Sequence, residues 1–267
     1  MTTTSGKGRM DGKVAVITGA GSGIGRAAAL RLAEEGARIA LVDVKEERVA
    51  DVKRRIEEAG GEAIAIEADI SQAEDIESAI REAANRWDRL DAVFANAGIN
   101  GTLAPIETLT PEDWSTTLDI NLKGTFLTVK YAVPFLKQNG GSIVITSSIN
   151  GNRVFSNFGM SAYSTSKAGQ VAFMQMAALE LAQFGIRVNA ICPGAIKTHI
   201  GQNTHPTPEV EEIKIPVEFP EGDQPLENAP GRASQVGDLV LFLASDASSH
   251  ITGTPIYIDG AESLLRG

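Results

Sequence analysis

The sequence predicts an α/β protein in which helices cover both faces of one parallel sheet. Short apolar runs rich in Val, Ile and Ala alternate with amphipathic segments of helical composition along most of the chain. Such alternation is typical of βαβ units joined by right-handed crossovers. With 267 residues, 43% of them hydrophobic, the chain is also long enough to bury the core of one such domain.

The expected elements follow one another in strict alternation up to residue 192. The expected strands are 13–18, 38–43, 63–67, 91–95, 141–147, 186–192 and 255–259. The expected helices are 26–35, 45–59, 71–86, 110–137, 162–184 and 234–244. Gly36 and Gly60 follow the first two helices and predict their ends, and Pro111 after Thr110 predicts the start of the fourth. Ligands should bind at the carboxyl ends of the strands, which share one edge of a parallel sheet.

A glycine-rich turn, Thr18-Gly-Ala-Gly-Ser-Gly-Ile-Gly25, links the first expected strand to the first helix. Its glycines let the backbone approach a pyrophosphate, and the free N–H groups of the following helix stabilise the phosphate charge. Asp43 ends the second strand, 18 residues after Gly25. A carboxylate there accepts hydrogen bonds from ribose hydroxyls and repels a 2′-phosphate, which favours NAD over NADP. A solvated acid at a strand end is the alternative for Asp43.

Tyr163 and Lys167 stand four residues apart at the start of the helix 162–184, so both side chains can reach one pocket. A cation beside a phenol favours the phenolate and lowers its pKa from about 10, which makes the two a proton-transfer pair. The spacing alone is also that of a solvated helix edge. Asn121 interrupts an apolar part of the helix 110–137, either for a functional reason or to bond a neighbouring carbonyl.

Composition excludes several classes of partner. A net charge of −10 disfavours nucleic acid, whose phosphates require Lys and Arg. No apolar run approaches the roughly 20 residues of a membrane span, and residues 1–10 lack the apolar segment of a signal peptide, so we expect a cytoplasmic protein. We expect these ten residues to be a mobile leader before one domain, 11–267. The single Cys192 and three scattered histidines predict neither a disulfide nor a metal site.

Two irregular segments interrupt the alternation and are expected near the site. The first, 149–162, carries Asn150, Val154, Phe155, Asn157 and Phe158, which could form the wall of a substrate pocket. The second, 199–230, holds six of the eleven prolines and shows no period. A loop of this length in a compact domain is commonly a lid or a disordered segment.

The motifs 18–25, Asn96-Ala-Gly98, Asn121, Ser148, Tyr163-x-x-x-Lys167 and Pro193-Gly194-x-x-x-Thr198 stand in this order. Together they resemble the short-chain dehydrogenase/reductase family, in its single-domain branch. The resemblance covers residues 12 to about 260. It implies a Rossmann-like fold with a seven-stranded parallel sheet in the order 3-2-1-4-5-6-7, flanked by helices. It also identifies residues 199–230 as the variable substrate loop of the family.

The resemblance implies four catalytic residues. Tyr163 is the acid/base, and Lys167 lowers its pKa and holds the nicotinamide ribose. Ser148 bonds the reacting substrate oxygen, and Asn121 fixes a water that continues a proton relay. Ser147 is a rival for the serine role, but the Ser-x-x-Gly pattern begins at Ser148. The fifteen positions from Ser148 to Tyr163 are slightly more than the family's usual spacing, so analogy with its substrates is less safe.

The resemblance also identifies the residues that bind the cofactor. They are Gly19, Ser22, Gly23, Ile24, Gly25, Asp43, Asp69, Ile70, Asn96, Ala97, Gly98, Tyr163, Lys167, Pro193, Gly194, Ile196 and Thr198. The implied activity is NAD-dependent hydride transfer between nicotinamide and a small secondary alcohol or ketone. One alternative is the reduction of 3-oxoacyl thioesters, although the acidic net charge disfavours an acidic carrier protein. An alternative of another class is a catalytically silent nucleotide sensor or scaffold.

The family further implies a homotetramer in which the helices that carry Asn121 and Tyr163 pair between subunits. Small or apolar residues at expected outer positions of these helices fit such pairing. They are Ala132, Ala168, Ala172 and Met176.

Overall fold

Seven parallel strands form one sheet in the computed structural model, which describes residues 8–198, 200–215, 219 and 222–266. The strands are β1 (Val14–Thr18), β2 (Arg38–Asp43), β3 (Ala63–Glu67), β4 (Ala92–Ala95), β6 (Gly141–Thr146), β7 (Ile186–Pro193) and β11 (Pro255–Ile258). Their order across the sheet is β3-β2-β1-β4-β6-β7-β11. Counted along the chain this is 3-2-1-4-5-6-7, so the predicted fold and strand order are confirmed.

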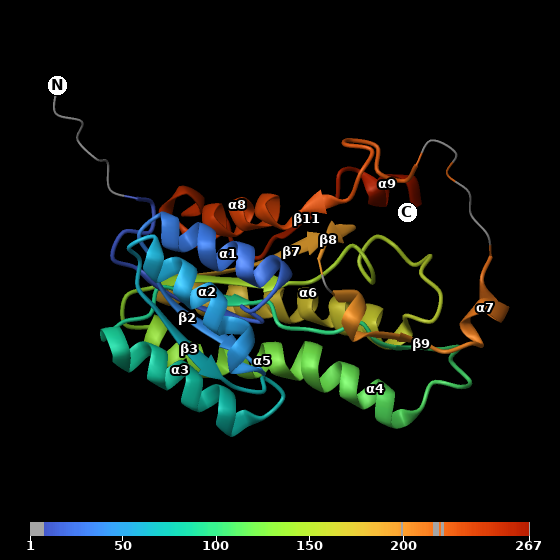
Figure 1. Cartoon of the computed structure of the whole chain (residues 1–267), viewed down its shortest axis with the longest axis horizontal. Coiled ribbons are helices and arrows are strands. Elements are labelled where there is room, and N and C mark those ends of the chain that lie inside the picture. Colours follow the sequence, from blue (N-terminus) through green and yellow to red (C-terminus); the bar gives the residue numbers. More distant parts are fainter. Residues whose placement is uncertain (1–7, 199, 216–218, 220–221, 267) are drawn as a thin grey trace.

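Helices cover both faces of this sheet, with α1 and α8 above it and α3 and α5 below it in Figure 1. The helices are α1 (Gly23–Glu34), α2 (Glu46–Glu58), α3 (Ala73–Trp87), α4 (Pro111–Leu118), α5 (Gly124–Leu136), α6 (Ser161–Leu181), α7 (Val210–Ile213), α8 (Ala233–Ala244) and α9 (Glu262–Arg266).

Successive side chains of β1 pack alternately against the helices on one face of the sheet and the helices on the other. Val14 and Val16 belong to a buried cluster with apolar side chains of α3, α5 and α6. Ala15 and Ile17 belong to a second cluster with those of α1, α2 and α8. Successive residues of a strand point to opposite faces, so a continuous apolar run is required where both faces are covered.

The predicted long helix 110–137 consists of three parts. Its start is as predicted, because Thr110 Oγ1 accepts a hydrogen bond from the Asp113 N–H at 3.1 Å and Pro111 is the first helical residue. A π-helix, Asp119–Lys123, then separates α4 from α5. Such one-turn interruptions are frequent at functional sites, and this one is centred on the fully buried Asn121.

Short strand pairs fix one part of the segment 199–230 and the residues on either side of it. β9 (Thr204–Pro206) pairs with β5 (Gly101–Leu103), and β10 (Gly231–Arg232) pairs with β8 (Ile196–Lys197). Val210, at the start of α7, is buried. Within the expected loop, residues 199, 216–218 and 220–221 lie outside the described residues.

The packed part of the chain begins before residue 11. Met10 is fully buried, and its N–H donates to the carbonyl of Glu35 at 3.0 Å. The rest of the expected leader, residues 1–7, lies outside the described residues. None of the helices in the described ranges combines the length and the apolar character that a bilayer span requires.

Candidate active site

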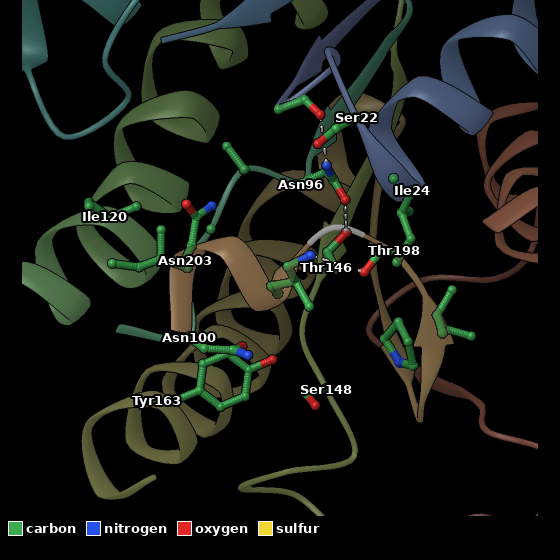
Figure 2. Close-up of a pocket in the computed structure, with 18 of the residues that line it drawn as sticks. Ser22, Ile24, Asn96, Asn100, Ile120, Thr146, Ser148, Tyr163, Thr198 and Asn203 are labelled. Atoms are coloured by element: carbon green, nitrogen blue, oxygen red, sulfur yellow. Dashed lines mark hydrogen bonds between the residues drawn. The ribbon is translucent and has the colours of Figure 1, made fainter. Parts of the chain in front are cut away.

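A cavity of about 720 Å³ opens at the carboxyl ends of the strands, and Figure 2 shows part of its lining. Its walls come from the segments that follow β1, β2, β3, β4, β6 and β7, because the carboxyl ends of parallel strands share one edge of the sheet. Apart from Gly25 and Asn121, all of the predicted catalytic and cofactor-binding residues line this cavity.

The glycine turn forms one end of the cavity. Gly19 has a φ of +65°, which glycine adopts without strain. A Cβ at Gly25 would lie 2.1 Å from the carbonyl oxygen of Gly19, so this glycine permits close packing of helix on strand and does not face the cavity. The side chain of Ser22 forms no cap, and the first turn of α1 holds no acid. The N–H groups at this helix start therefore fit an anion such as a pyrophosphate.

Asp43 lies at the same end of the cavity. Its Oδ2 accepts a hydrogen bond from the Gly21 N–H at 3.1 Å, and its Oδ1 is 3.7 Å from Nη1 of Arg48. Arg48 and Arg26 also line the cavity. The sequence analysis missed Arg48, since a cation on the charged face of α2 is usually solvated. Asp43 pairs with this cation, which would otherwise attract a phosphate.

Asn96 ties three strands together beneath the middle of the cavity. Its Nδ2 donates to the carbonyl of Thr18 at 3.1 Å, and its Oδ1 accepts from Oγ1 of Thr146 at 3.1 Å (Figure 2). Its own N–H donates to Oγ1 of Thr18 at 3.0 Å. These bonds join β1, β4 and β6 and so fix the segment Ala97-Gly98 that lines the cavity.

Asn121 lies behind that wall and not in it. Its Oδ1 accepts from the Ile99 N–H at 2.9 Å, and its Nδ2 donates to the Ile99 carbonyl at 2.9 Å and to Oγ of Ser166 at 3.0 Å. Its carbonyl accepts from Thr125 Oγ1 and Gln170 Nε2. Both side-chain donors are used within the protein, so Asn121 positions Ile99. The role of Asn121 in holding a relay water stays a prediction.

Tyr163, Lys167 and Ser148 meet in the cavity, the first two from the start of α6 and the third from the end of β6. The hydroxyl of Ser148 lies near enough to the phenol of Tyr163 to favour the phenolate and so to counter part of the rise in its pKa. Nζ of Lys167 donates to the carbonyl of Thr146 at 2.8 Å and lies 5.6 Å from the centre of the Tyr163 ring. The neighbouring Ser147 instead donates to the carbonyl of Lys167 at 2.7 Å and so fixes the helix.

Burial controls the pKa values of this pair. The pKa of Tyr163 is raised because the phenolate would be desolvated, and the nearby hydroxyl of Ser148 offsets only part of this. The sequence analysis expected Lys167 to lower the pKa of Tyr163. The pKa is raised instead, because the effect of burial outweighs the other contributions. Desolvation also lowers the pKa of Lys167 from 10.5 to about 8, so at neutral pH the group is still an ammonium.

The far end of the cavity is lined by carboxamides. They are Asn100, Asn150, Asn157, Gln202 and Asn203. The sequence analysis expected Asn150 and Asn157 in a substrate wall, and both line the cavity. Val154, Phe155 and Phe158 are not part of the lining. Val154 is buried, 77% of Phe155 is exposed, and Phe158 is half-buried outside the cavity. Asn100, Gln202 and Asn203 were missed, since a single amide in a loop belongs to no motif.

Comparison with known proteins agrees with this geometry. A family model described as enoyl-(acyl carrier protein) reductase matches residues 19–261. The cyclohexanol dehydrogenase of Acinetobacter sp. (strain SE19) is 37% identical over 254 residues, which are 95% of this chain and 96% of that protein.

Solved structures agree as well. A 3-ketoacyl-ACP reductase from Sinorhizobium meliloti 1021 is 49% identical with a TM-score of 0.91, over 95% of this chain and 100% of the other. A 3-ketoacyl-(acyl-carrier-protein) reductase from Brucella melitensis, complexed with NADH, is 28% identical with a TM-score of 0.83, over 95% and 99% of the two chains. The matched family model, these relatives and the seven-stranded sheet establish that the chain belongs to the short-chain dehydrogenase/reductase family.

Proposed function

We propose that this oxidoreductase transfers hydride between NAD and a small secondary alcohol or its ketone. One observation carries the proposal: Tyr163, Lys167 and Ser148 line the same cavity as the uncapped start of α1 and Asp43. A proton-transfer group thus lines the same cavity as a cradle suited to a dinucleotide.

The proposed mechanism assigns one task to each side chain. A bound oxidised nicotinamide would supply the acceptor for the hydride that leaves the carbinol carbon. In oxidation, Oη of Tyr163 takes the proton of the substrate hydroxyl, and in reduction it returns that proton. The hydroxyl of Ser148 donates to the same substrate oxygen. The ammonium of Lys167 stabilises the phenolate form of Tyr163 and is positioned for this by the carbonyl of Thr146.

Asp43 supports the preference for NAD over NADP. Its carboxylate is buried at the cavity end formed by the glycine turn, where the adenosine ribose would bind. There it can accept hydrogen bonds from both ribose hydroxyls, and it would repel a 2′-phosphate. Its pairing with Arg48 also removes the attraction that this cation would have for a phosphate.

Reduction of 3-oxoacyl thioesters is the second candidate, and the 49% identity to the reductase from Sinorhizobium meliloti favours it. The cavity offers little for the phosphates of such a substrate, because Arg48 pairs with Asp43 and Arg26 pairs with Asp51, both on the side of the glycine turn. A catalytically silent sensor is disfavoured, since Asn121, Ser148 and the Tyr163–Lys167 pair are all present.

A homotetramer is the proposed assembly. Ala132, expected on an outer helix face, is fully buried in the core and cannot serve, because this side of α5 faces the sheet. On α6, Ala168 is half-buried, while Ala172 and Met176 are exposed. Leu179, three residues beyond Met176, is also exposed and extends the same face of the helix. Light scattering of the purified protein should give four chains per particle, and a monomer would contradict the proposal.

The experiment that tests the activity is a substrate panel. Purified protein with NAD is given secondary alcohols, among them cyclohexanol and small polyols, and separately a 3-hydroxyacyl thioester, while absorbance of reduced nicotinamide is followed. We expect reduced nicotinamide with at least one free alcohol. Turnover of the thioester alone would favour the second candidate. Binding of NAD without any turnover would favour a silent protein.

A further inference from the structure

The carboxamides at the far end of the cavity belong to the half of the sheet that lies away from the glycine turn. Asn100 follows β4, Asn150 and Asn157 follow β6, and Gln202 and Asn203 form part of a 3-10 helix, Ile200–Asn203, after β7. Figure 2 shows Asn100, Asn203, Tyr163 and Ser148 among the side chains around the cavity. Three separate segments thus present the same chemical group to the space beside the reacting residues.

In several of these carboxamides, one side-chain atom is hydrogen-bonded within the protein. The other atom remains available to a ligand in the cavity. Nδ2 of Asn100 donates to Oγ1 of Thr204 at 2.8 Å, which leaves its Oδ1 as an acceptor. Nδ2 of Asn157 donates to Oδ1 of Asn150 at 2.6 Å, which leaves the Nδ2 of Asn150 and the Oδ1 of Asn157. A hydroxyl both donates and accepts, so neighbouring amide donors and acceptors are complementary to neighbouring hydroxyls.

Charged groups are concentrated elsewhere in the cavity. The charged residues among its described lining are Arg26, Asp43, Arg48, Asp69, Lys167 and Glu262. The first four belong to the segments between β1 and α3, on the side of the glycine turn, and Lys167 belongs to the proton-transfer pair. Oε2 of Glu262 accepts from the Ala195 N–H at 2.8 Å and so fixes the segment after β7. The carboxamide end therefore fits a neutral polar molecule.

Apolar side chains of the same segments, Ile99, Ile149, Met160 and Ile200, also line the cavity, but a wholly apolar substrate would leave the amides without partners. Amides that lose water and gain no partner cost about 1–3 kcal/mol each. A site built to bond hydroxyls therefore discriminates strongly against an analogue that lacks them. The volume of about 720 Å³ must also hold a dinucleotide, so the substrate is small.

From these observations we infer that the substrate is a small neutral polyhydroxylated compound, a polyol or sugar. Its reacting secondary carbinol lies at Tyr163 and Ser148, and its neighbouring hydroxyls bind the carboxamides Asn100, Asn150, Asn157, Gln202 and Asn203. This inference rests on the proposed function and adds the class of alcohol to it.

The first test compares matched alcohols that differ only in extra hydroxyls. Initial rates with NAD are measured for cyclohexanol against inositol isomers and for butan-2-ol against four-carbon polyols. An N-acetylcysteamine 3-hydroxyacyl thioester is included because it presents the thioester substrate without phosphate groups. We expect kcat/KM for the best polyol to exceed that of its plain partner by about 100-fold or more, as expected when two amides would otherwise stay unpaired.

The second test changes the amides themselves. Gln202→Leu removes an exposed amide that lines the cavity and that bonds no other side chain among the described residues. Asn157→Leu removes another amide of the lining. Each should reduce the ratio of polyol to plain-alcohol kcat/KM by about tenfold, through KM more than kcat. Gln138→Leu, at an exposed position outside the cavity, is the matched control and should leave the ratio unchanged. NAD binding and the melting temperature confirm that each variant is folded.

The outcomes separate this inference from the activity on which it rests. Preference for the polyols, with the loss of that preference in Gln202→Leu, supports it. Preference for cyclohexanol or butan-2-ol overturns the polyol inference, while the proposed alcohol dehydrogenase activity still stands. Preference for the thioester overturns it in favour of the second candidate. Measurable NAD binding without turnover of any compound overturns both.

Discussion

Lys167 is a buried ammonium whose position costs the fold stability. Only 4% of the residue is exposed, and its bond to the Thr146 carbonyl replaces a full hydration shell. The pKa of about 8, against an ordinary 10.5, reports this cost. The proposed chemistry needs a cation beside Tyr163, so stability is given up here for function.

A pH series of unfolding tests this reading of Lys167. Between pH 8 and 10.5 the unfolded chain keeps the proton that the folded chain has lost, so the stability of the wild type rises with pH in that window. Below pH 8, Lys167 is protonated in both the folded and the unfolded chain, so the folded chain bears the full cost of burying the ammonium. Compared with Lys167→Met, the wild type should therefore gain free energy of unfolding as pH rises from about 8 to 10. The raised pKa of Tyr163 puts its titration in the folded protein above this window. A pH-independent difference between the two proteins would contradict the account.

Asp43 and Arg48 form a pair whose separation should alter cofactor choice. Asp43→Ser removes the charge that repels a 2′-phosphate and releases Arg48 to attract one. We expect the NADP to NAD ratio of kcat/KM to rise by about 100-fold, equivalent to about 2.7 kcal/mol. Adding Arg48→Ala should remove a large part of that gain. An unchanged ratio in Asp43→Ser would show that the carboxylate does not face the ribose.

At the scale of residues, the sequence predicts the parts of the site that lie on motifs. Tyr163, Lys167, Ser148 and the glycine turn are recognisable because chemistry or backbone geometry demands those residue types at fixed spacing. Arg48 and Asn100 could not be found, since their relevance depends on which loops the fold brings together. The direction of the Tyr163 pKa was also out of reach, because burial is a property of the folded chain.

Among the elements, the π-helix Asp119–Lys123 has a definite task. It turns Asn121 toward Ile99 and Ser166 and so connects the α4–α5 segment, the loop after β4 and α6. A helical period cannot reveal this insertion, so the sequence predicted one continuous helix. The polar residue inside an apolar stretch was the only sign of it.

Replacing Asn121 tests that task. Asn121→Leu would leave the N–H and the carbonyl of Ile99 without partners, and each buried loss costs about 1–3 kcal/mol. We expect the free energy of unfolding in urea to fall by about 2–4 kcal/mol and the affinity for NAD to weaken, because Ile99 follows the segment Ala97-Gly98 that lines the cavity. Asn139→Leu, at an exposed position after α5, is the control. Wild-type stability in Asn121→Leu would refute the positioning role.

For the whole molecule, the order of the sheet follows from the alternation of strands and helices, which leaves few topologies with right-handed crossovers. The pairs β5–β9 and β8–β10 were not foreseen, since two or three residues carry no period. These short pairs fasten the segment after β7 beside the cavity. The amides Gln202 and Asn203 therefore stand near Tyr163 through contacts that only the complete fold provides.

The central claim is that Tyr163 moves the proton while hydride passes to a nicotinamide in the same cavity. The most direct measurement uses the best alcohol of the panel, deuterated at its carbinol carbon, with NAD and either the wild type or Tyr163→Phe. Mass spectrometry of the reduced nicotinamide should find the deuterium after turnover by the wild type. Tyr163→Phe should still bind NAD and transfer almost none. Label transfer by Tyr163→Phe at the wild-type rate, or reduced nicotinamide without deuterium, would contradict the account.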